Sequence, residues 1–401
     1  MTDIPEPGRD PARPAHACSG QVRRLDLDWL RICAFALLIL YHTGMFYVTW
    51  DWHVKSPRAS DVIEPLMMLS SPWRLGLLFL VSGAATRFLS DRLAPAALAR
   101  NRVHRLLWPL LFGMFVVVPP QAYLEVVEKL GWTGSYPAFM RLYVQGYGGF
   151  CRSGDCLALP TWNHLWFVAY LLVYGLLLAA LLAARPVLPR LPHLPDRLVV
   201  PLFVIGPWLW LWTMRALLFP RFDSTHALVD DWYNHSIYLP LFLLGFVIAR
   251  SDRIAEATVR LRWIALAAFA LGWSRLFLMD LSDRSPPMDL LLGRGLRELQ
   301  AWGAILACLG FARLHLSGAD GPARRWLTRA IFPFYIVHQT AIVVAAHLLA
   351  RQALPLPLEA GLVLLATIAA CVGAAMAAMA WPPLGAVLGV PPKRPLSPGR
   401  A

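Results

Sequence analysis

In the stretch Asp28-Trp-Leu-Arg31-Ile-Cys-Ala-Phe-Ala-Leu-Leu-Ile-Leu-Tyr-His42, the ionisable residues Arg31 and His42 flank a largely apolar run. Eleven steps of about 100° bring Arg31 and His42 to within ~20° of the same face of a helix. At ~1.5 Å per residue they lie roughly 16 Å apart along the axis, about half the thickness of a hydrocarbon core. Charge at that depth is costly, so the pair is a candidate functional site.

The rest of the chain repeats this apolar character. Of its 401 residues, 58% are hydrophobic and only 15% are charged. Apolar stretches of roughly 20 residues recur along it, which excludes a soluble globular protein and predicts an all-α, polytopic membrane protein. We predict about ten transmembrane helices, at residues 29–49, 73–90, 106–124, 164–184, 198–219, 237–250, 262–279, 294–314, 328–350 and 358–380.

The distribution of the net charge of +13 predicts the orientation of these helices. Lys and Arg form short clusters in alternate loops and make no contiguous stripe, so they favour membrane topology over nucleic-acid binding. By the positive-inside rule the loops that carry them, and both termini, face the cytoplasm. The clusters are Arg23, Arg24, Arg92, Arg100, Arg102, Arg105, Arg185, Arg190, Arg197, Arg250, Arg253, Arg260, Arg262, Arg313, Arg324, Arg325, Arg329, Lys393 and Arg394.

The two ends of the chain differ from its middle. Residues 1–24 are a polar cytoplasmic tail without an apolar core and cleavage site, so we expect the first helix to act as the insertion signal. Residues 25–381 form the transmembrane domain, and 382–401 a Pro-rich cytoplasmic tail that we expect to be disordered. We expect the protein to be a multi-pass protein of a bacterial-type inner membrane.

The cysteines and histidines do not predict a metal centre. The sequence contains no CxxC motif and no His-rich ligand set, so no metal is expected. Cys151 and Cys156 lie close together in a predicted outer loop, where they form either a disulfide or two free thiols.

Arginines gather at the predicted cytoplasmic ends of the first three helices. They are Arg31, Arg87, Arg102 and Arg105, and the last two are spaced i,i+3 on one helix face. Clustered guanidinium groups suit a polyanion such as the phosphates of acyl-coenzyme A. The alternatives are ordinary flanking charge and contact with anionic lipid headgroups.

Three polar residues are predicted nearer the middle of the membrane: His42, Ser82 and His338. Histidine is the side chain best matched to proton transfer near neutral pH. His42 and His338 are therefore candidate catalytic residues, with a purely structural histidine as the alternative for each. Ser82 is either an acyl relay or a hydrogen-bonding contact between helices, and the contact is favoured.

On the predicted outer side, Glu125, His164 and Trp166 are candidates for binding an acceptor. Trp162, His164 and Trp166 offer ring faces on which a sugar can stack, although an interfacial aromatic belt explains tryptophans equally well. Further polar residues at this depth are Asp230, Asp231, His235, Arg294, Arg297 and Glu298.

Together these residues resemble the acyltransferase-3 family of integral membrane O-acyltransferases. The similar segments are Leu27-Asp28-Trp-Leu-Arg31 with ten residues before His42, Phe79-Leu-Val-Ser82-Gly83 with Arg87, Arg102-x-x-Arg105-Leu-x-x-Pro109, and Phe332-Pro-Phe-Tyr335-Ile-Val-His338. Pro119-Pro120-Gln121-Ala-Tyr-Leu-Glu125 and His164-Leu-Trp166-Phe further resemble the subgroup that contains the osmoregulated periplasmic glucan succinylation protein. That similarity implies polysaccharide modification in glucan biosynthesis.

The sequence departs from the family pattern in two places. Ile32 stands where the family commonly has a glycine directly after the first-helix arginine. No esterase-like domain follows the tenth predicted helix. The resemblance therefore implies a membrane-only form, in which helices and outer loops engage the acceptor.

The resemblance implies transfer of an acetyl or succinyl group from cytoplasmic acyl-coenzyme A to a hydroxyl of an extracytoplasmic glycan. The catalytic residues would be His42, Arg31 and His338. The donor would bind to Arg31, Arg87, Arg102 and Arg105, and the acceptor to Glu125, His164 and Trp166. The rival hypothesis is a transporter or flippase for a glycan or an anionic metabolite. Inverted halves with matching interrupted helices would favour transport, and the sequence contains none.

Overall fold

The fold is described from a computed structural model that covers residues 24–152, 154–185, 195–279 and 286–391. The chain is an all-α, multi-pass membrane protein, as predicted. Within the described residues one small sheet occurs, in which β1 (Cys151–Arg152) pairs with antiparallel β2 (Asp155–Cys156). Cys151 and Cys156 form a disulfide across it. Arg23, Arg190, Lys393 and Arg394 lie outside the described residues.

The chain forms a succession of helices joined by turns and longer loops. In chain order they are α1 (Leu25–Met45), α2 (Glu64–Met67), α3 (Arg74–Ser90), α4 (Pro95–Arg102), η1 (Val103–Leu107), α5 (Trp108–Phe112), η2 (Gly113–Val117), α6 (Pro119–Leu130), α7 (Tyr136–Val144), η3 (Asn163–Leu165), α8 (Trp166–Ala184), α9 (Asp196–Leu217), α10 (Trp232–Ile248), α11 (Asp252–Leu278), α12 (Pro287–His315), α13 (Pro322–Leu349), η5 (Ala350–Gln352), α14 (Leu356–Ala380) and α15 (Pro382–Val387).

Each of the ten predicted spans overlaps a helical stretch. Among the residues that the structure describes, six stretches are long and apolar enough to cross a membrane: Pro95–Leu130, Asn163–Ala184, Asp196–Leu217, Asp252–Leu278, Pro322–Gln352 and Leu356–Ala380. The other predicted spans overlap α1, α3, α10 and α12. Because α3 and α10 have 17 residues each and α1 and α12 carry several charges, the number of spans stays a prediction.

The third predicted span is longer than expected. Residues 95–130 form one continuous helical stretch in which two π-helical segments, η1 and η2, interrupt the α-helix. A proline follows each π segment closely, at the start of α5 and of α6, where a missing N–H is tolerated. These prolines therefore do not end the span.

The expectation of a disordered C-terminal tail is wrong for its first part. Residues 382–387 form α15, and Leu388 after it is buried. Pro382 and Pro383 favour this helix because they occupy its first turn, where no backbone N–H is needed. Residues 392–401 lie outside the described part of the chain.

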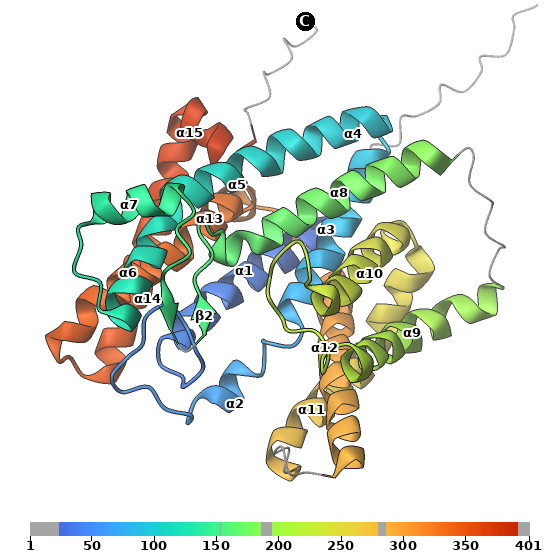
Figure 1. Ribbon diagram of the computed structural model, residues 1–401. Coiled ribbons are helices and arrows are strands. Elements are labelled where there is room, and N and C mark those ends of the chain that lie inside the picture. Colours follow the sequence, from blue (N-terminus) through green and yellow to red (C-terminus); the bar gives the residue numbers. More distant parts are fainter. Residues whose placement is uncertain (1–23, 153, 186–194, 280–285, 392–401) are drawn as a thin grey trace, which may run out of the picture.

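Helix α1 occupies the centre of the bundle. It packs against α3, α12, α13 and α14, and Figure 1 shows α13 and α14 on one side of it and α9 to α12 on the other. Aromatic side chains from three helices meet beside α1: the Phe35 ring lies 5.3 Å from that of Tyr335, and Phe167 lies 5.9 Å from Tyr335. Buried aromatic side chains therefore pack beside the face of α1 that carries Arg31 and His42.

Two glycines allow α3 and α10 to approach closely. A Cβ atom on Gly83 would lie 1.8 Å from the carbonyl oxygen of Phe242, and one on Gly245 would lie 1.9 Å from that of Leu80. Small residues at such reciprocal positions let the backbones of membrane helices touch. The Ser-Gly motif of α3 thus has a packing role at Gly83.

A lysine orders the loop that follows α1. Nζ of Lys55 donates hydrogen bonds to the carbonyl oxygens of Met45 (2.7 Å), Val48 and Trp50 (2.8 Å). A cation at a helix C-terminus interacts favourably with the helix dipole and with its unpaired carbonyls. This contact holds the loop containing His53 against the end of α1.

Candidate active site

His42 and His338 form the centre of the candidate site. Nδ1 of His42 lies 2.9 Å from Nε2 of His338, and the two rings are nearly parallel, with centroids 5.1 Å apart and an interplanar angle of 5°. His42 belongs to the last turn of α1 and His338 to the middle of α13. The contact between α1 and α13 thus brings together two histidines that were predicted on different helices.

The partners of His338 fix the tautomer of both neutral rings. Nδ1 of His338 lies 2.7 Å from the carbonyl oxygen of Tyr335 and 3.2 Å from that of Phe334. A carbonyl oxygen only accepts, so Nδ1 of His338 carries the proton and its Nε2 accepts from Nδ1–H of His42. Nε2 of His42 is left with a free lone pair, as a general base requires.

His164 joins the same cluster. Its ring centroid lies 5.1 Å from that of His338, and its Nε2 lies 3.1 Å from the carbonyl oxygens of Tyr335 and Ile336. These contacts make Nε2 the donor and leave Nδ1 buried, without a hydrogen-bond partner among the described residues. Sequence reasoning assigned His164 to a shallower level than His42 and His338, whereas the structure groups all three.

A basic cavity of about 290 Å³, here called the inner cavity, lies beside the first half of α1. Arg102 in its wall donates a hydrogen bond of 2.6 Å to the hydroxyl of Thr86. No Asp or Glu is part of the described lining, so the cavity is strongly positive. Its polar lining consists of Arg31, Ser82, Thr86, Asn101, Arg102, Arg105, Thr328 and Arg329.

Arg87 does not line the inner cavity. It pairs instead with Asp91 one turn later, at 3.5 Å, and its guanidinium lies 5.3 Å from the ring centroid of Phe246. Arg87 therefore lies apart from Arg31, Arg102 and Arg105, and its role in binding the donor stays a prediction. Helix α3 turns Arg87 towards α10, while it turns Ser82 and Thr86 towards the inner cavity.

One face of α1 connects the inner cavity with the space around His42. Arg31 and Phe35 line the inner cavity, and Leu38 and His42 line a second one, as their i,i+4 and i,i+3 spacings predict. Phe167 lines both cavities. The rings of Phe35, Phe167 and Tyr335 thus form an aromatic septum between a basic site and a histidine site.

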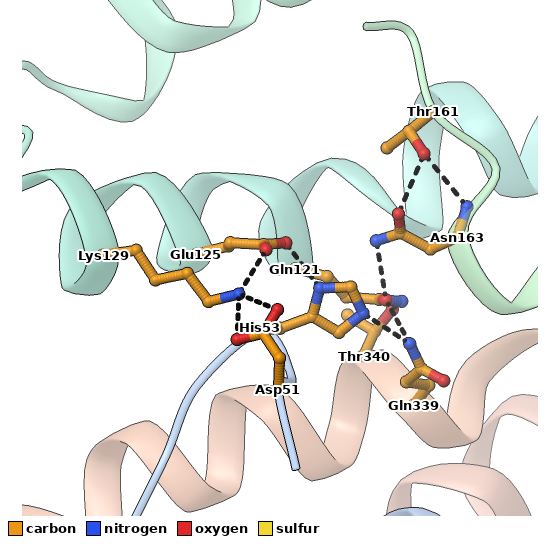
Figure 2. Close-up of polar contacts among 9 residues, drawn as sticks. All are labelled: Asp51, His53, Gln121, Glu125, Lys129, Thr161, Asn163, Gln339 and Thr340. Atoms are coloured by element: carbon orange, nitrogen blue, oxygen red, sulfur yellow. Dashed lines mark hydrogen bonds and ion pairs between the residues drawn. The ribbon is translucent and has the colours of Figure 1, made fainter. Parts of the chain in front are cut away.

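The second cavity, here called the outer cavity, has a volume of about 410 Å³ and a continuous hydrogen-bond network in its wall. Figure 2 shows side chains of α6, of α13 and of two loops converging in this network. Its members are Asp51, His53, Gln121, Glu125, Lys129, Thr161, Asn163, Gln339 and Thr340.

Glu125 is the anionic centre of the network. It accepts from Nδ1 of His53 at 2.6 Å and from Nζ of Lys129 at 2.9 Å (Figure 2). The amide of Gln339 donates to Nε2 of His53 at 2.8 Å and to Oε1 of Gln121 at 3.1 Å. The chain of bonds therefore holds His53 as a donor to Glu125 and ties the outer loop to α13.

Aromatic rings also line the outer cavity. Trp52, Trp162 and Trp166 line it, and the His226 ring lies 4.5 Å from that of Trp166. The indole N–H of Trp162 donates to the carbonyl oxygen of His226 at 3.1 Å. Burial lowers the pKa of His226 from its ordinary value of 6.5, against the opposing effect of the Asp231 carboxylate.

A third cavity, here called the side cavity, has a volume of about 360 Å³ and meets the outer cavity at His42. His42, Trp52, Arg74, Trp166 and His226 line both of them. Arg215 and Arg297 in its wall contact Oε1 of Glu298, at 2.5 and 2.8 Å.

Several residues of these cavities were not found from the sequence: His53, Arg74, Lys129, His226 and Gln339. His53 and His226 lie in loops, where no periodic pattern assigns a direction to a side chain. The position of Arg74 at the start of an apolar run was an available signal. Conversely, His235 contacts the hydroxyl of Tyr174 at 2.8 Å and lines none of the three cavities.

The described part of the chain contains no group of three or more His, Cys, Asp or Glu side chains arranged to hold a metal ion. Comparison with known proteins gives one match: residues 24–376 fit a family model described as an acyltransferase domain. Neither the curated proteins nor the solved structures contain a match to the chain.

Proposed function

Because this chain belongs to the acyltransferase-3 family, and is thus a multi-pass membrane acyltransferase, we propose that it moves a short acyl group from acyl-coenzyme A to a glycan hydroxyl. The group is acetyl or succinyl, and the membrane is a bacterial-type inner membrane. The donor enters from the cytoplasm and the glycan from the opposite side. The family match supports this reaction over the transport alternative.

The charge of the inner cavity supports binding of the donor there. Guanidinium groups bind phosphates through paired, charge-assisted hydrogen bonds, and Arg31, Arg102 and Arg105 all line this cavity. The positive-inside rule assigns the same end of α1 to the cytoplasm. In this proposal the phosphates stay among the arginines, and the pantetheine arm extends past the aromatic septum towards His42.

His42 is the proposed general base. Its Nε2 accepts the proton of the acceptor hydroxyl while the hydroxyl oxygen attacks the thioester carbonyl carbon. A C–O bond forms, the C–S bond breaks, and the departing thiolate takes the proton from His42. The products are the acylated glycan and free coenzyme A. His338 orients His42 and stabilises the charge that develops on it.

The lining of the outer cavity supports a sugar as the acceptor. Pockets that bind polar ligands combine apolar ring faces with a few convergent hydrogen-bonding groups. Trp162 and Trp166 supply ring faces, and Glu125, Asn163 and Gln339 supply polar groups. In this proposal His164 closes the inner end of the acceptor site.

The observation that carries the proposal is the hydrogen-bond chain from Nδ1 of His42 through His338 to the carbonyl of Tyr335. The test uses purified full-length protein in lipid nanodiscs, radiolabelled acetyl- or succinyl-coenzyme A, and glucan oligosaccharides. Label should move to the glycan, and His42→Ala should lower the rate by about 10²–10⁴-fold. His104→Gln, which changes an exposed histidine outside the three cavities, serves as the control. Unchanged transfer by His42→Ala would reject the base role.

A further inference from the structure

Arg74 is a buried cation beside the proposed base that the reaction described above does not use. It is only 4% exposed, lines both the outer and the side cavity, and has no carboxylate within ion-pair distance among the described residues. Its Nε and Nη1 atoms have no hydrogen-bond partner in the same part of the chain. A buried, uncompensated guanidinium is costly, and an anion entering the cavity would compensate it.

The nearest attraction for Arg74 is an aromatic ring rather than an anion. Its Cζ lies 3.3 Å from the ring centroid of Tyr41. A cation–π contact contributes roughly 0.5–2 kcal/mol, and it gives Nε and Nη1 of Arg74 no oxygen acceptor. Tyr41 can therefore hold the plane of Arg74 while these two nitrogens stay available to a ligand.

The rest of the side cavity is also positively charged. Arg74, Arg215 and Arg297 line it, and Glu298 is the acidic residue in its described lining. Both Arg215 and Arg297 contact the same oxygen of Glu298. Three cations against one carboxylate leave a formal excess of two positive charges in the lining of this cavity.

We propose that the side cavity binds a carboxylate carried by one of the two substrates, with Arg74 as its main anchor. This inference rests on the proposed function, because His42 lines the same cavity and so brings the carboxylate near the reacting atoms. A planar guanidinium matches a carboxylate in a two-bond geometry, which an ammonium group cannot reproduce. The carboxylate belongs either to the transferred acyl group or to the glycan.

The first experiment measures binding without requiring catalysis. Isothermal titration calorimetry of the full-length protein in nanodiscs is performed with succinate and with succinamide, its uncharged analogue. Succinate should bind and succinamide should not. Arg74→Gln should weaken succinate binding at least tenfold, and Arg74→Lys should restore it only in part. Arg351→Gln, at an exposed arginine outside the cavities, is the matched control and should leave binding unchanged.

The second experiment identifies the source of the carboxylate. Transfer to a neutral glucan is compared for succinyl- and acetyl-coenzyme A, and transfer from acetyl-coenzyme A is compared for neutral and glucuronate-containing acceptors. If the acyl group carries the anion, Arg74→Gln lowers kcat/KM for succinyl transfer at least tenfold and spares acetyl transfer. If the glycan carries it, the same variant selectively lowers transfer to the glucuronate acceptor.

Two results would overturn the proposal. One is equal succinate binding by the unmodified protein, Arg74→Gln and Arg351→Gln. The other is an equal loss of all four transfer rates in Arg74→Gln, which would indicate a structural role. If Arg74→Gln does not fold, Arg297→Gln is judged by the same criteria. Absence of acyl transfer from every donor would reject the proposed function. The succinate titration would still show whether the side cavity binds a carboxylate through Arg74.

Discussion

The imidazole of His42 is hydrogen-bonded to that of His338, 296 residues later in the chain, at 2.9 Å. His338 in turn bonds to the carbonyl of Tyr335 at 2.7 Å, so His42 is held by a group that is itself fixed to its helix. This arrangement separates two roles. His42 contacts the reacting hydroxyl in the proposed reaction, and His338 is a positioning residue that acts through His42.

A double-mutant cycle tests this division of roles. His42→Ala should lower kcat by about 10²–10⁴-fold. His338→Phe should lower it by up to about 10²-fold, because a small displacement of a base has an effect of that size. The double variant should be no slower than His42→Ala alone, since His338 acts only through His42. KM for the acyl donor should not change.

The rates would be measured under donor saturation, with His104→Gln as the folded control. If the two reductions in kcat multiply in the double variant, His338 does not act through His42 and has an independent role. A rise in KM for the donor in His338→Phe would instead indicate that the aromatic septum had moved.

Substitutions in the inner cavity test where the donor binds. Arg102→Gln and Arg105→Gln should each raise KM for acyl-coenzyme A, because a charge-assisted hydrogen bond contributes about 1.5–3 kcal/mol. That range corresponds to roughly 10- to 100-fold in KM. kcat should change little, because these residues are distant from the histidines. Higher salt should raise KM in the unmodified protein.

Two other arginines of the same region provide the comparison. Arg100 is exposed and lies outside the inner cavity, and Arg87 is paired with Asp91. Arg87→Gln and Arg100→Gln should leave KM for the donor within about twofold of the original value. A large rise in KM for Arg87→Gln would restore the grouping that the sequence favoured.

The arrangement of residues within a single helix could be predicted from the sequence. The shared face of Arg31 and His42 follows from helical periodicity, and residues 31, 35, 38 and 42 indeed line successive cavities. The family resemblance likewise agrees with the family model that residues 24–376 match. Both rest on short segments that can be recognised one at a time.

The parts that sequence reasoning could not reach depend on contacts between distant segments. The pairing of His42 with His338 requires the packing of α1 on α13, which no spacing encodes. His53 lies in a loop whose course is set by Lys55 and by its bonds to Glu125 and Gln339. Helical spacing gives the depth of a residue along its own helix only, so it does not predict that the rings of His164 and His338 lie side by side.

The close approach of α3 and α10 predicts a stability defect. Gly83→Ala places a methyl group against the backbone of α10, so the two helices must separate. The expected loss is about 1–3 kcal/mol of unfolding free energy. Thermal unfolding of the purified protein, followed by intrinsic fluorescence, measures it. Gly206→Ala in α9, where a Cβ would meet open space, is the matched control and should be neutral; equal stability of both variants would contradict the packing argument.

The buried His226 predicts that stability depends on pH. Burial lowers the pKa of His226 in the folded protein, while in the unfolded chain it keeps its ordinary value near 6.5. Between these two values the unfolded state binds more protons, so the free energy of unfolding falls as the pH is lowered through this window. Below the folded-state pKa the loss is complete and becomes constant.

Thermal unfolding from pH 7.5 to pH 5 would test this with His226→Gln and Arg221→Gln. The second variant changes an exposed residue of the same loop that is not a histidine. The difference in Tm between the unmodified protein and His226→Gln should shrink as the pH falls, because only the former loses stability through His226. Arg221→Gln should follow the unmodified protein at every pH. A Tm difference for His226→Gln that is independent of pH would show that protonation of His226 costs the folded state nothing.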